Sequence, residues 1–222
     1  MRSGRIEDAR MRQLLQTYLV IGSPNCREEP LRVLEEGLAG GVTLVQFREK
    51  GPGALTGESL RALALQLQAA CRRRGVPFLV NDDVELALAI NADGVHVGQE
   101  DEVAVRVRAR IGDRILGVSA HTLAEAEAAV HHGADYLGIG PIYPTASKAD
   151  AEAPQGPGIL RMLRASGITL PLVGIGGITT ETAGEVIRAG ADGVAVISAI
   201  TQAANIREAA SRFVAISVAE SS

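Results

Sequence analysis

The chain has 222 residues, a hydrophobic content of 46% and a formal net charge of −4, which is enough sequence to bury the core of one domain. An aromatic content of 3%, the absence of tryptophan and the lack of a long basic run argue against a nucleic-acid-binding surface. No apolar run reaches the roughly 18 residues of a membrane span. Cys26 and Cys71 form no metal-spaced pair or disulfide framework, and the N-terminus is unlike a signal peptide, so we expect a cytoplasmic protein.

The chain order of apolar and polar runs predicts alternating strands and helices. Residues 1–16 are expected to form an N-terminal arm and short helix, and residues 17–222 a single catalytic domain. Near-continuous apolar runs, typical of strands buried on both faces of a parallel sheet, lie at 17–22, 42–47, 78–81, 94–98, 115–119, 136–140, 171–175 and 193–197. Helices are expected between them, among others at 57–73, 83–91, 122–132, 179–189 and 199–214.

One short unit recurs where a helix ends and a strand begins. It reads Asn91-Ala92-Asp93, Gly133-Ala134-Asp135 and Gly190-Ala191-Asp192, and its first residue can adopt the left-handed conformation that stops a helix. Eight strand–helix units predict an α/β fold, a single-domain (β/α)8 TIM barrel. The alternative is a doubly wound open sheet, but residues 18–24 lack its glycine-rich fingerprint. In a barrel, function concentrates at the C-terminal rim, the ring of loops that follow the strands.

Cationic and amide side chains follow the second strand. Gln46, Arg48 and Lys50 are two apart and share one face of an extended run. Buried cations need an anionic partner, so this stretch is either a structural salt-bridge cluster or a site for an anionic ligand. Lysine occurs only at 50 and 148, and Lys148 lies in the long loop that runs from Pro141 to Gly158, which is typical of a lid or binding loop.

Carboxylates follow the next two strands. Asp82 has Glu85 three residues later, as in a capping box, and Asp101 would suit a helix N-terminus. As a pair, Asp82 and Asp101 could instead hold Mg²⁺ together with phosphate oxygens of a substrate.

The remaining rim residues point to a second anion site and to few acid–base groups. Ser119 could donate to a ligand, Thr122 and Glu125 form a capping box, and His121 is more often structural than catalytic at such a position. His96 is expected to line or fill the barrel. Glycines at 174–177 and the residues from 197 to 199 predict a phosphate site built from backbone amides after the last two strands.

These residues together resemble the thiamine phosphate synthase family over nearly the whole chain, from Tyr18 to Ile200. The motifs that carry the resemblance are Gln46-x-Arg48-x-Lys50, Asn81-Asp82, Asp93-Gly-Val-His96-Val-Gly-Gln99-Glu-Asp101, Gly117-Val-Ser119-Ala-His121-Thr122, Gly140-Pro-Ile-Tyr-Pro-Thr145, Gly174-Ile-Gly-Gly177-Ile178 and Val196-Ile197-Ser198-Ala199-Ile200.

The resemblance implies a transferase that joins a hydroxymethylpyrimidine diphosphate to a thiazole monophosphate, releasing pyrophosphate by a dissociative reaction. It implies that Arg48, Lys50, Ser119 and Lys148 are catalytic and that Asp82 and Asp101 bind Mg²⁺. It also implies that the partners are small phosphorylated substrates rather than nucleic acid or membrane, and it is compatible with a homodimer. The pyrimidine diphosphate would be held by Gln46, Arg48, Lys50, Asn81, Ser119 and Lys148, and the thiazole phosphate by Thr145, Ser147, Gly177, Ile197 and Ser198. The family usually has threonine where this chain has Ser147, which keeps the hydroxyl.

Three other functions stay open at this point. A thiazole tautomerase on the same barrel would need a proton-shuttling residue such as His121 and no metal pair. A non-catalytic regulator that binds a phosphorylated metabolite would bind ligand without releasing pyrophosphate. Another phosphate-binding barrel enzyme should show a dedicated acid–base pair, and the sequence offers none that we can identify.

Overall fold

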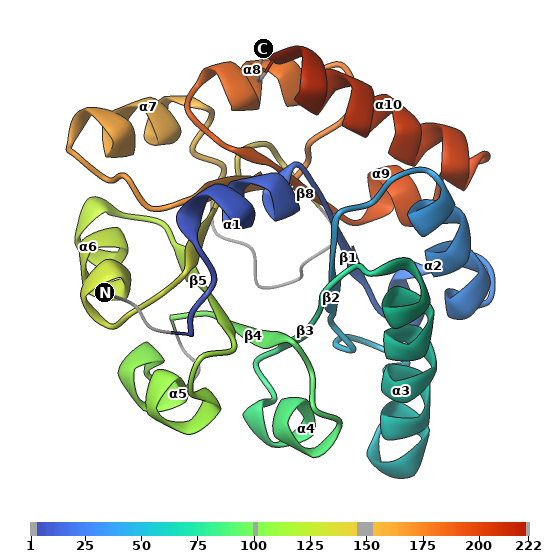
Figure 1. Ribbon diagram of the computed structural model, residues 1–222. Coiled ribbons are helices and arrows are strands. Elements are labelled where there is room, and N and C mark those ends of the chain that lie inside the picture. Colours follow the sequence, from blue (N-terminus) through green and yellow to red (C-terminus); the bar gives the residue numbers. More distant parts are fainter. Residues whose placement is uncertain (1–3, 100–101, 146–152, 221–222) are drawn as a thin grey trace.

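The structure, a computed structural model, is a closed barrel of eight parallel strands (Figure 1) and describes residues 4–99, 102–145 and 153–220. Each strand pairs with the next in the sequence, and β1 pairs with β8 to close the barrel. This confirms the predicted (β/α)8 fold and all eight strand positions. The strands are β1 Thr17–Ile21, β2 Leu44–Phe47, β3 Phe78–Asn81, β4 Gly94–Val97, β5 Ile115–Ala120, β6 Tyr136–Ile139, β7 Leu172–Ile175 and β8 Gly193–Val196.

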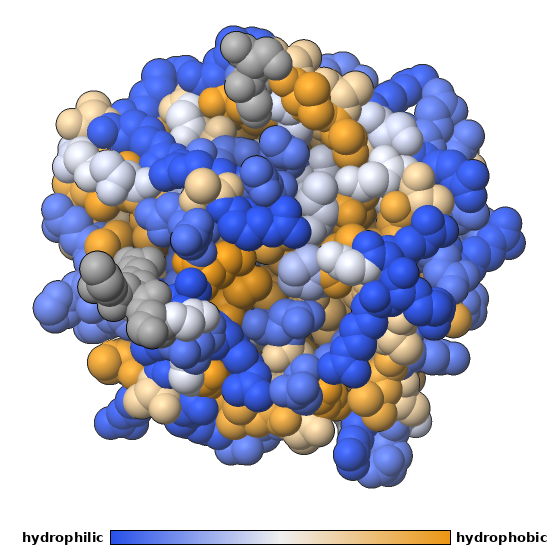
Figure 2. Space-filling view, in the orientation of Figure 1, coloured by the Kyte–Doolittle hydropathy of each residue, from blue (hydrophilic) through white to orange (hydrophobic). Residues whose placement is uncertain are grey.

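Helices form the outer ring, and one of them crosses an end of the barrel. Helix α1 packs Met11, Leu14 and Leu15 against the side chains that fill the barrel and lies over the barrel axis on the near side of Figure 1. That side is the N-terminal end, and its surface is mostly hydrophilic (Figure 2). The helices are α1 Asp8–Leu15, η1 Ser23–Asn25, α2 Pro30–Ala39, α3 Gly57–Arg74, α4 Val84–Ala89, α5 Ala104–Ile111, α6 Leu123–His131, α7 Gly158–Ala165, α8 Ala183–Arg188, α9 Ser198–Thr201 and α10 Ile206–Glu220. No helix in the described part of the chain is both long and apolar enough to cross a membrane.

Helix ends follow the expected chemistry, with one exception. Asn91, Gly133 and Gly190 all have positive φ, which confirms the left-handed helix stop predicted for the recurring unit. The helix expected over 199–214 is wrong, because the structure has two helices there, α9 and α10. The Asn205 side chain accepts a hydrogen bond from the backbone N–H of Glu208 (3.1 Å) and thereby starts a new helix.

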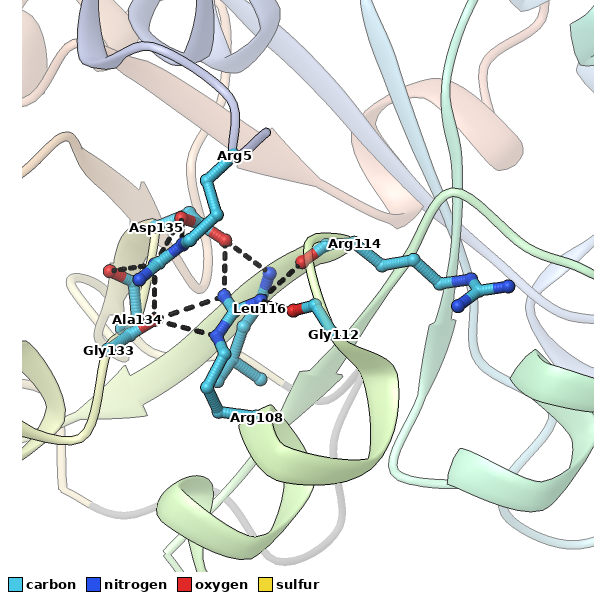
Figure 3. Close-up of polar contacts among 8 residues, drawn as sticks. All are labelled: Arg5, Arg108, Gly112, Arg114, Leu116, Gly133, Ala134 and Asp135. Carbon is cyan, nitrogen blue, oxygen red and sulfur yellow. Dashed lines mark hydrogen bonds and ion pairs between the residues drawn. The ribbon is translucent and has the colours of Figure 1, made fainter. Parts of the chain in front are cut away.

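The aspartate of the same unit holds the N-terminal end of the barrel together. Asp93, Asp135 and Asp192 each accept the backbone N–H of a residue in the preceding strand, at 2.8 Å in all three cases. Arg5 and Arg108 bind the Asp135 carboxylate (Figure 3). The Asp192 carboxylate likewise forms ion pairs with two arginines, Arg12 and Arg164. Because Arg5 and Arg12 belong to the N-terminal segment, these ion pairs fasten that segment to the barrel.

Candidate active site

A cavity of about 1070 Å³ opens at the C-terminal rim and is lined by loops from all around the barrel. Most of the predicted site residues that the structure describes line it: Gln46, Arg48, Lys50, Asn81, Ser119, Thr145, Gly177, Ile197 and Ser198. Asp82 adjoins it through Lys50 and Asn81. The other three predicted residues, Asp101, Ser147 and Lys148, lie outside the described residues. A second hollow of about 650 Å³ lies at the N-terminal end, where Arg12 and Arg164 are already paired with Asp192, so we place the site at the rim.

Asp82 lies beside the first lysine because its neighbour takes the capping role. The prediction that Asp82 caps the next helix is wrong. Asp83 is the N-cap of α4 and accepts from the N–H of Leu86 at 2.8 Å. Asp82 has a φ of 58° and accepts hydrogen bonds from the Lys50 ammonium and, at 2.6 Å, from the Asn81 amide. The salt-bridge interpretation of Lys50 is therefore partly correct, although the pair borders the cavity and its lysine is 47% exposed.

Glu49, which the sequence analysis missed, fixes the stretch that carries the cations. Its carboxylate accepts from the backbone N–H of Ser23 at 2.8 Å, from the Ser23 hydroxyl and from the backbone N–H of Leu55 at 2.9 Å. It thereby joins the loops that follow β1 and β2. The neighbouring Arg48 and Lys50 line the cavity. The sequence did hold a signal for this role. Glu49 stands between Arg48 and Lys50 in an extended run, where alternate side chains point to opposite sides, so its carboxylate must point away from the two cations.

A chain of buried polar side chains crosses the inside of the barrel below the cavity. The Gln46 amide nitrogen donates to the Tyr18 hydroxyl at 2.5 Å, and Tyr18 lies 2.7 Å from the Tyr136 hydroxyl. Tyr136 is 2.9 Å from Nδ1 of His96, and Nε2 of His96 is 2.9 Å from the Ser119 hydroxyl. His96 therefore lines the barrel, as expected, while sequence reasoning missed both tyrosines. Burial raises the pKa of Tyr18 and of Tyr136, so both phenols keep their protons at neutral pH.

His121 sits in the cap of the helix that follows β5. Its backbone N–H donates to the Glu125 carboxylate at 2.7 Å, and its Nδ1 lies 3.3 Å from the same group. Thr122 accepts from the N–H of Glu125 at 3.2 Å, which confirms the predicted Thr122 cap. These contacts support the structural interpretation of His121, although the residue also borders the cavity.

The opposite wall of the cavity is made of glycine-rich backbone. Gly176 and Gly177, which follow β7, have φ values of 97° and 63°. A Cβ on Gly177 would lie 2.4 Å from the carbonyl oxygen of Pro144 in the neighbouring loop, so no other residue fits there. Ser198 is the first residue of α9 and faces the same cavity. Main-chain N–H groups can approach an anion in such places, and this arrangement matches the predicted position of the second anion site.

Comparisons with known proteins agree on one family. Residues 17–200 match the family model described as Thiamine monophosphate synthase. The chain is 63% identical to the thiamine-phosphate synthase of Geobacillus kaustophilus over 206 residues, which cover 93% of each chain. It is 56% identical to that of Bacillus cereus over 210 residues, covering 95% of this chain and 96% of the other. It also resembles the solved structure of thiamine phosphate pyrophosphorylase from Pyrococcus furiosus, with a TM-score of 0.84, 34% identity and coverage of 95% of this chain and 98% of that one.

Proposed function

The chain belongs to the thiamine monophosphate synthase family, as a transferase that forms thiamine phosphate, and from that premise we propose how its site works. We propose that it condenses 4-amino-2-methyl-5-hydroxymethylpyrimidine diphosphate with thiazole monophosphate and releases pyrophosphate, assisted by Mg²⁺. The observation that carries this proposal is the rim cavity, which brings Arg48 and Lys50 on one wall together with the Gly176–Gly177 backbone on the other. Two anionic substrates can bind there side by side.

The wall formed by β2, β3 and β5 suits the pyrimidine diphosphate. Arg48 and Lys50 supply positive charge, and Lys148 from the loop after β6 is proposed to add a third cation. Asn81 and Ser119 offer hydrogen-bond donors to phosphate oxygens. Gln46, which is only 4% exposed, lies deeper and would contact the pyrimidine ring.

The other wall suits the thiazole phosphate. Its contacts would come from the loops after β6, β7 and β8, where main-chain N–H groups and hydroxyls bind phosphate without adding charge. The residues proposed for this site are Thr145, Ser147, Gly177, Ile197 and Ser198.

The carboxylate beside Lys50 fits a hard divalent cation. The Asp82 side chain is 17% exposed and adjoins the cationic wall, and Mg²⁺ in proteins is typically held by one or two carboxylates, with waters and substrate phosphates as the other ligands. The described residues contain no group of three or more metal-binding side chains, so we propose that the protein contributes Asp82 and Asp101. When bound there, Mg²⁺ would neutralise charge on the diphosphate that leaves.

The reaction that follows needs charge stabilisation more than proton transfer. The bond between the pyrimidine methylene carbon and the diphosphate oxygen breaks, and its electron pair leaves with pyrophosphate, whose charge Arg48, Lys50 and Lys148 stabilise. The pyrimidine ring delocalises the resulting cation. The thiazole nitrogen then attacks with a lone pair that carries no proton, so no general base is required. That agrees with the contacts of His121, which hold it in a helix cap.

The test is to mix both substrates with Mg²⁺ and to measure pyrophosphate and thiamine phosphate together. Equal amounts of the two products are expected, with neither formed when one substrate is omitted or Mg²⁺ is chelated. Arg48→Ala should be severely impaired, whereas the matched surface variant Arg72→Ala, on the exposed end of α3, should not. Ligand binding without pyrophosphate release would support the regulator instead, and metal-independent turnover that is lost in His121→Ala would support the tautomerase.

We further propose a cytoplasmic location and a homodimeric assembly, with small phosphorylated molecules as the ligands. The two free thiols, buried Cys71 and half-buried Cys26, are compatible with a reducing compartment. Sedimentation of the purified protein tests the dimer directly, because a mass near that of one 23.2 kDa chain would refute it.

A further inference from the structure

The buried chain from Gln46 to Ser119 has the donor and acceptor properties of a one-way sequence of hydrogen bonds. A tyrosine hydroxyl carries one proton, and a neutral imidazole has one donor and one acceptor nitrogen. Because the Gln46 amide nitrogen donates to Tyr18, the Tyr18 proton is directed to Tyr136 and the Tyr136 proton to Nδ1 of His96. The imidazole proton is then on Nε2 and is donated to the Ser119 oxygen. The Ser119 proton is left to point into the cavity.

Two glycines provide the space that this chain occupies. In the strand register Gly117 lies between His96 and Tyr136. A Cβ on Gly117 would be 2.2 Å from the Tyr136 ring and 2.5 Å from Nδ1 of His96. On β6, a Cβ on Gly138 would be 3.1 Å from the His96 ring. The backbone is therefore shaped around the contact between the histidine and the tyrosine.

The contacts described above allow two complete proton orders along this hydrogen-bond chain while His96 is neutral. If the Gln46 amide were turned over, its oxygen would accept from Tyr18, every proton along the chain would reverse, and Ser119 would have to donate to His96. A mixed order leaves one buried polar atom without its bond, which is costly inside a barrel where Tyr18 and Tyr136 are 1% and 0% exposed. The two ends of the chain are therefore coupled although they lie on different strands.

We propose that Tyr18, Tyr136 and His96 are positioning residues that fix Ser119 as a hydrogen-bond donor and Gln46 as an acceptor toward the ligand, and that this selects a pyrimidine bearing an amino group. The proposal rests on the proposed function, in which Ser119 meets an anionic diphosphate. An anion requires a donor at Ser119, and that requirement fixes the proton order given above. The Gln46 amide oxygen then faces the cavity and accepts from an N–H of the amino group on the pyrimidine ring.

This arrangement predicts discrimination against a substrate whose ring amino group is replaced by an oxo group. The oxo oxygen would lie against the Gln46 oxygen, and neither can donate. Turning the amide over would relieve that clash but would remove the Ser119 donor from the diphosphate. We expect kcat/KM for the 4-oxo analogue to be at least about 10³-fold below that of the amino substrate, since sites built around a buried hydrogen bond reject analogues strongly.

The kinetic test compares the two substrates in tyrosine variants. Tyr18→Phe releases the Gln46 amide, so the discrimination should fall at least about tenfold. Tyr136→Phe breaks the chain elsewhere and should have the same effect. The matched control is Tyr143→Phe, because Tyr143 is the chain's only other tyrosine and its hydroxyl contacts Glu185; it should keep the wild-type ratio. An unchanged ratio in folded Tyr18→Phe and Tyr136→Phe would overturn the proposal.

A second test reads the proton order directly and does not depend on turnover. Nitrogen-15 NMR of histidine-labelled wild-type protein with Mg²⁺ and inorganic pyrophosphate should show the Nε2–H tautomer for His96, with the resonance assigned by its loss in His96→Asn. Tyr18→Phe should keep this tautomer, whereas Tyr136→Phe removes the donor to Nδ1 and should give a mixture of the two His96 tautomers. An Nδ1–H or doubly protonated ring in the wild type would overturn the proposal. If the tautomer is as expected but no thiamine phosphate forms, the proposed function fails and the proton order stands.

Discussion

Replacing Asp135 by asparagine should destabilise the barrel strongly while leaving its chemistry intact. The substitution keeps the size of the side chain and an oxygen that can accept from the N–H of Leu116, so it removes mainly the negative charge. That charge lies at the N-terminal end of the barrel, where it binds Arg5 and Arg108 (Figure 3). The rim cavity lies at the other end, so kcat and KM measured at a temperature where the variant is folded should stay near wild type.

The expected magnitude follows from how deeply the group is buried. The Asp135 side chain is 1% exposed, and those of Arg5 and Arg108 are 14% and 15% exposed. Removing one partner of a buried ion pair typically costs about 3–5 kcal/mol. Arg108 retains hydrogen bonds to three carbonyl oxygens, which keep its guanidinium satisfied and favour the lower end, about 3 kcal/mol. These carbonyls belong to Gly112, Arg114 and Gly133. For a chain of this length that corresponds to a fall in Tm of about 6–12 °C.

The assay is thermal and urea unfolding, with Asp192→Asn as the matched control. Asp192 has the same arrangement, an N–H from the preceding strand and two arginines, but its side chain is 17% exposed. Better solvation should reduce its cost to about 1–2 kcal/mol. If Asp192→Asn proved as damaging as Asp135→Asn, or more so, burial would not be what sets the energy of these clusters and the reasoning would be refuted.

Three further predictions concern other parts of the chain. Lys148→Ala should lower the rate of pyrophosphate release by about 10²–10³, and a near wild-type rate would remove Lys148 from the mechanism. Gly177→Ala places a Cβ 2.4 Å from the neighbouring loop and should raise KM for the thiazole phosphate at least about tenfold, whereas Gly75→Ala, with φ also positive but open space around it, should not change KM. Burial raises the pKa of Cys26 and Cys71 from 9.0 to about 12, so neither thiol should react with iodoacetamide at pH 8 in the folded protein. Because the unfolded chain releases these protons near pH 9 and the folded one does not, the free energy of unfolding, measured in urea, should fall as the pH rises from 9 toward 12.

Sequence alone predicted the barrel and its rim because those depend on local patterns. Strands buried on both faces are near-continuous apolar runs, and polar residues that follow them must gather at one end. Gln46, Arg48, Lys50 and Ser119 were placed at the rim by that argument and Asn81 by the family resemblance, and the structure puts all of them around one cavity.

What the sequence did not reveal depends on contacts between distant or conformationally special residues. The capping-box spacing to Glu85 favoured Asp82 as the cap of α4, but the backbone takes a positive φ at Asp82 and the cap is Asp83. Glu49 ties two loops whose relative position is set by the barrel. Tyr18 and Tyr136 stand in apolar runs 118 positions apart, and nothing local distinguishes them from core aromatics until the closed barrel brings their hydroxyls together.

The two tyrosines inside the barrel also give the protein an optical property. The chain has no tryptophan and three tyrosines, and the rings of Tyr18 and Tyr136 meet edge to face with centroids 5.9 Å apart. Near-ultraviolet emission therefore arises largely from a pair of chromophores directly beneath the cavity. In Tyr143→Phe the signal would come from this pair alone, so occupancy of the cavity and opening of the barrel could both be followed without an added label.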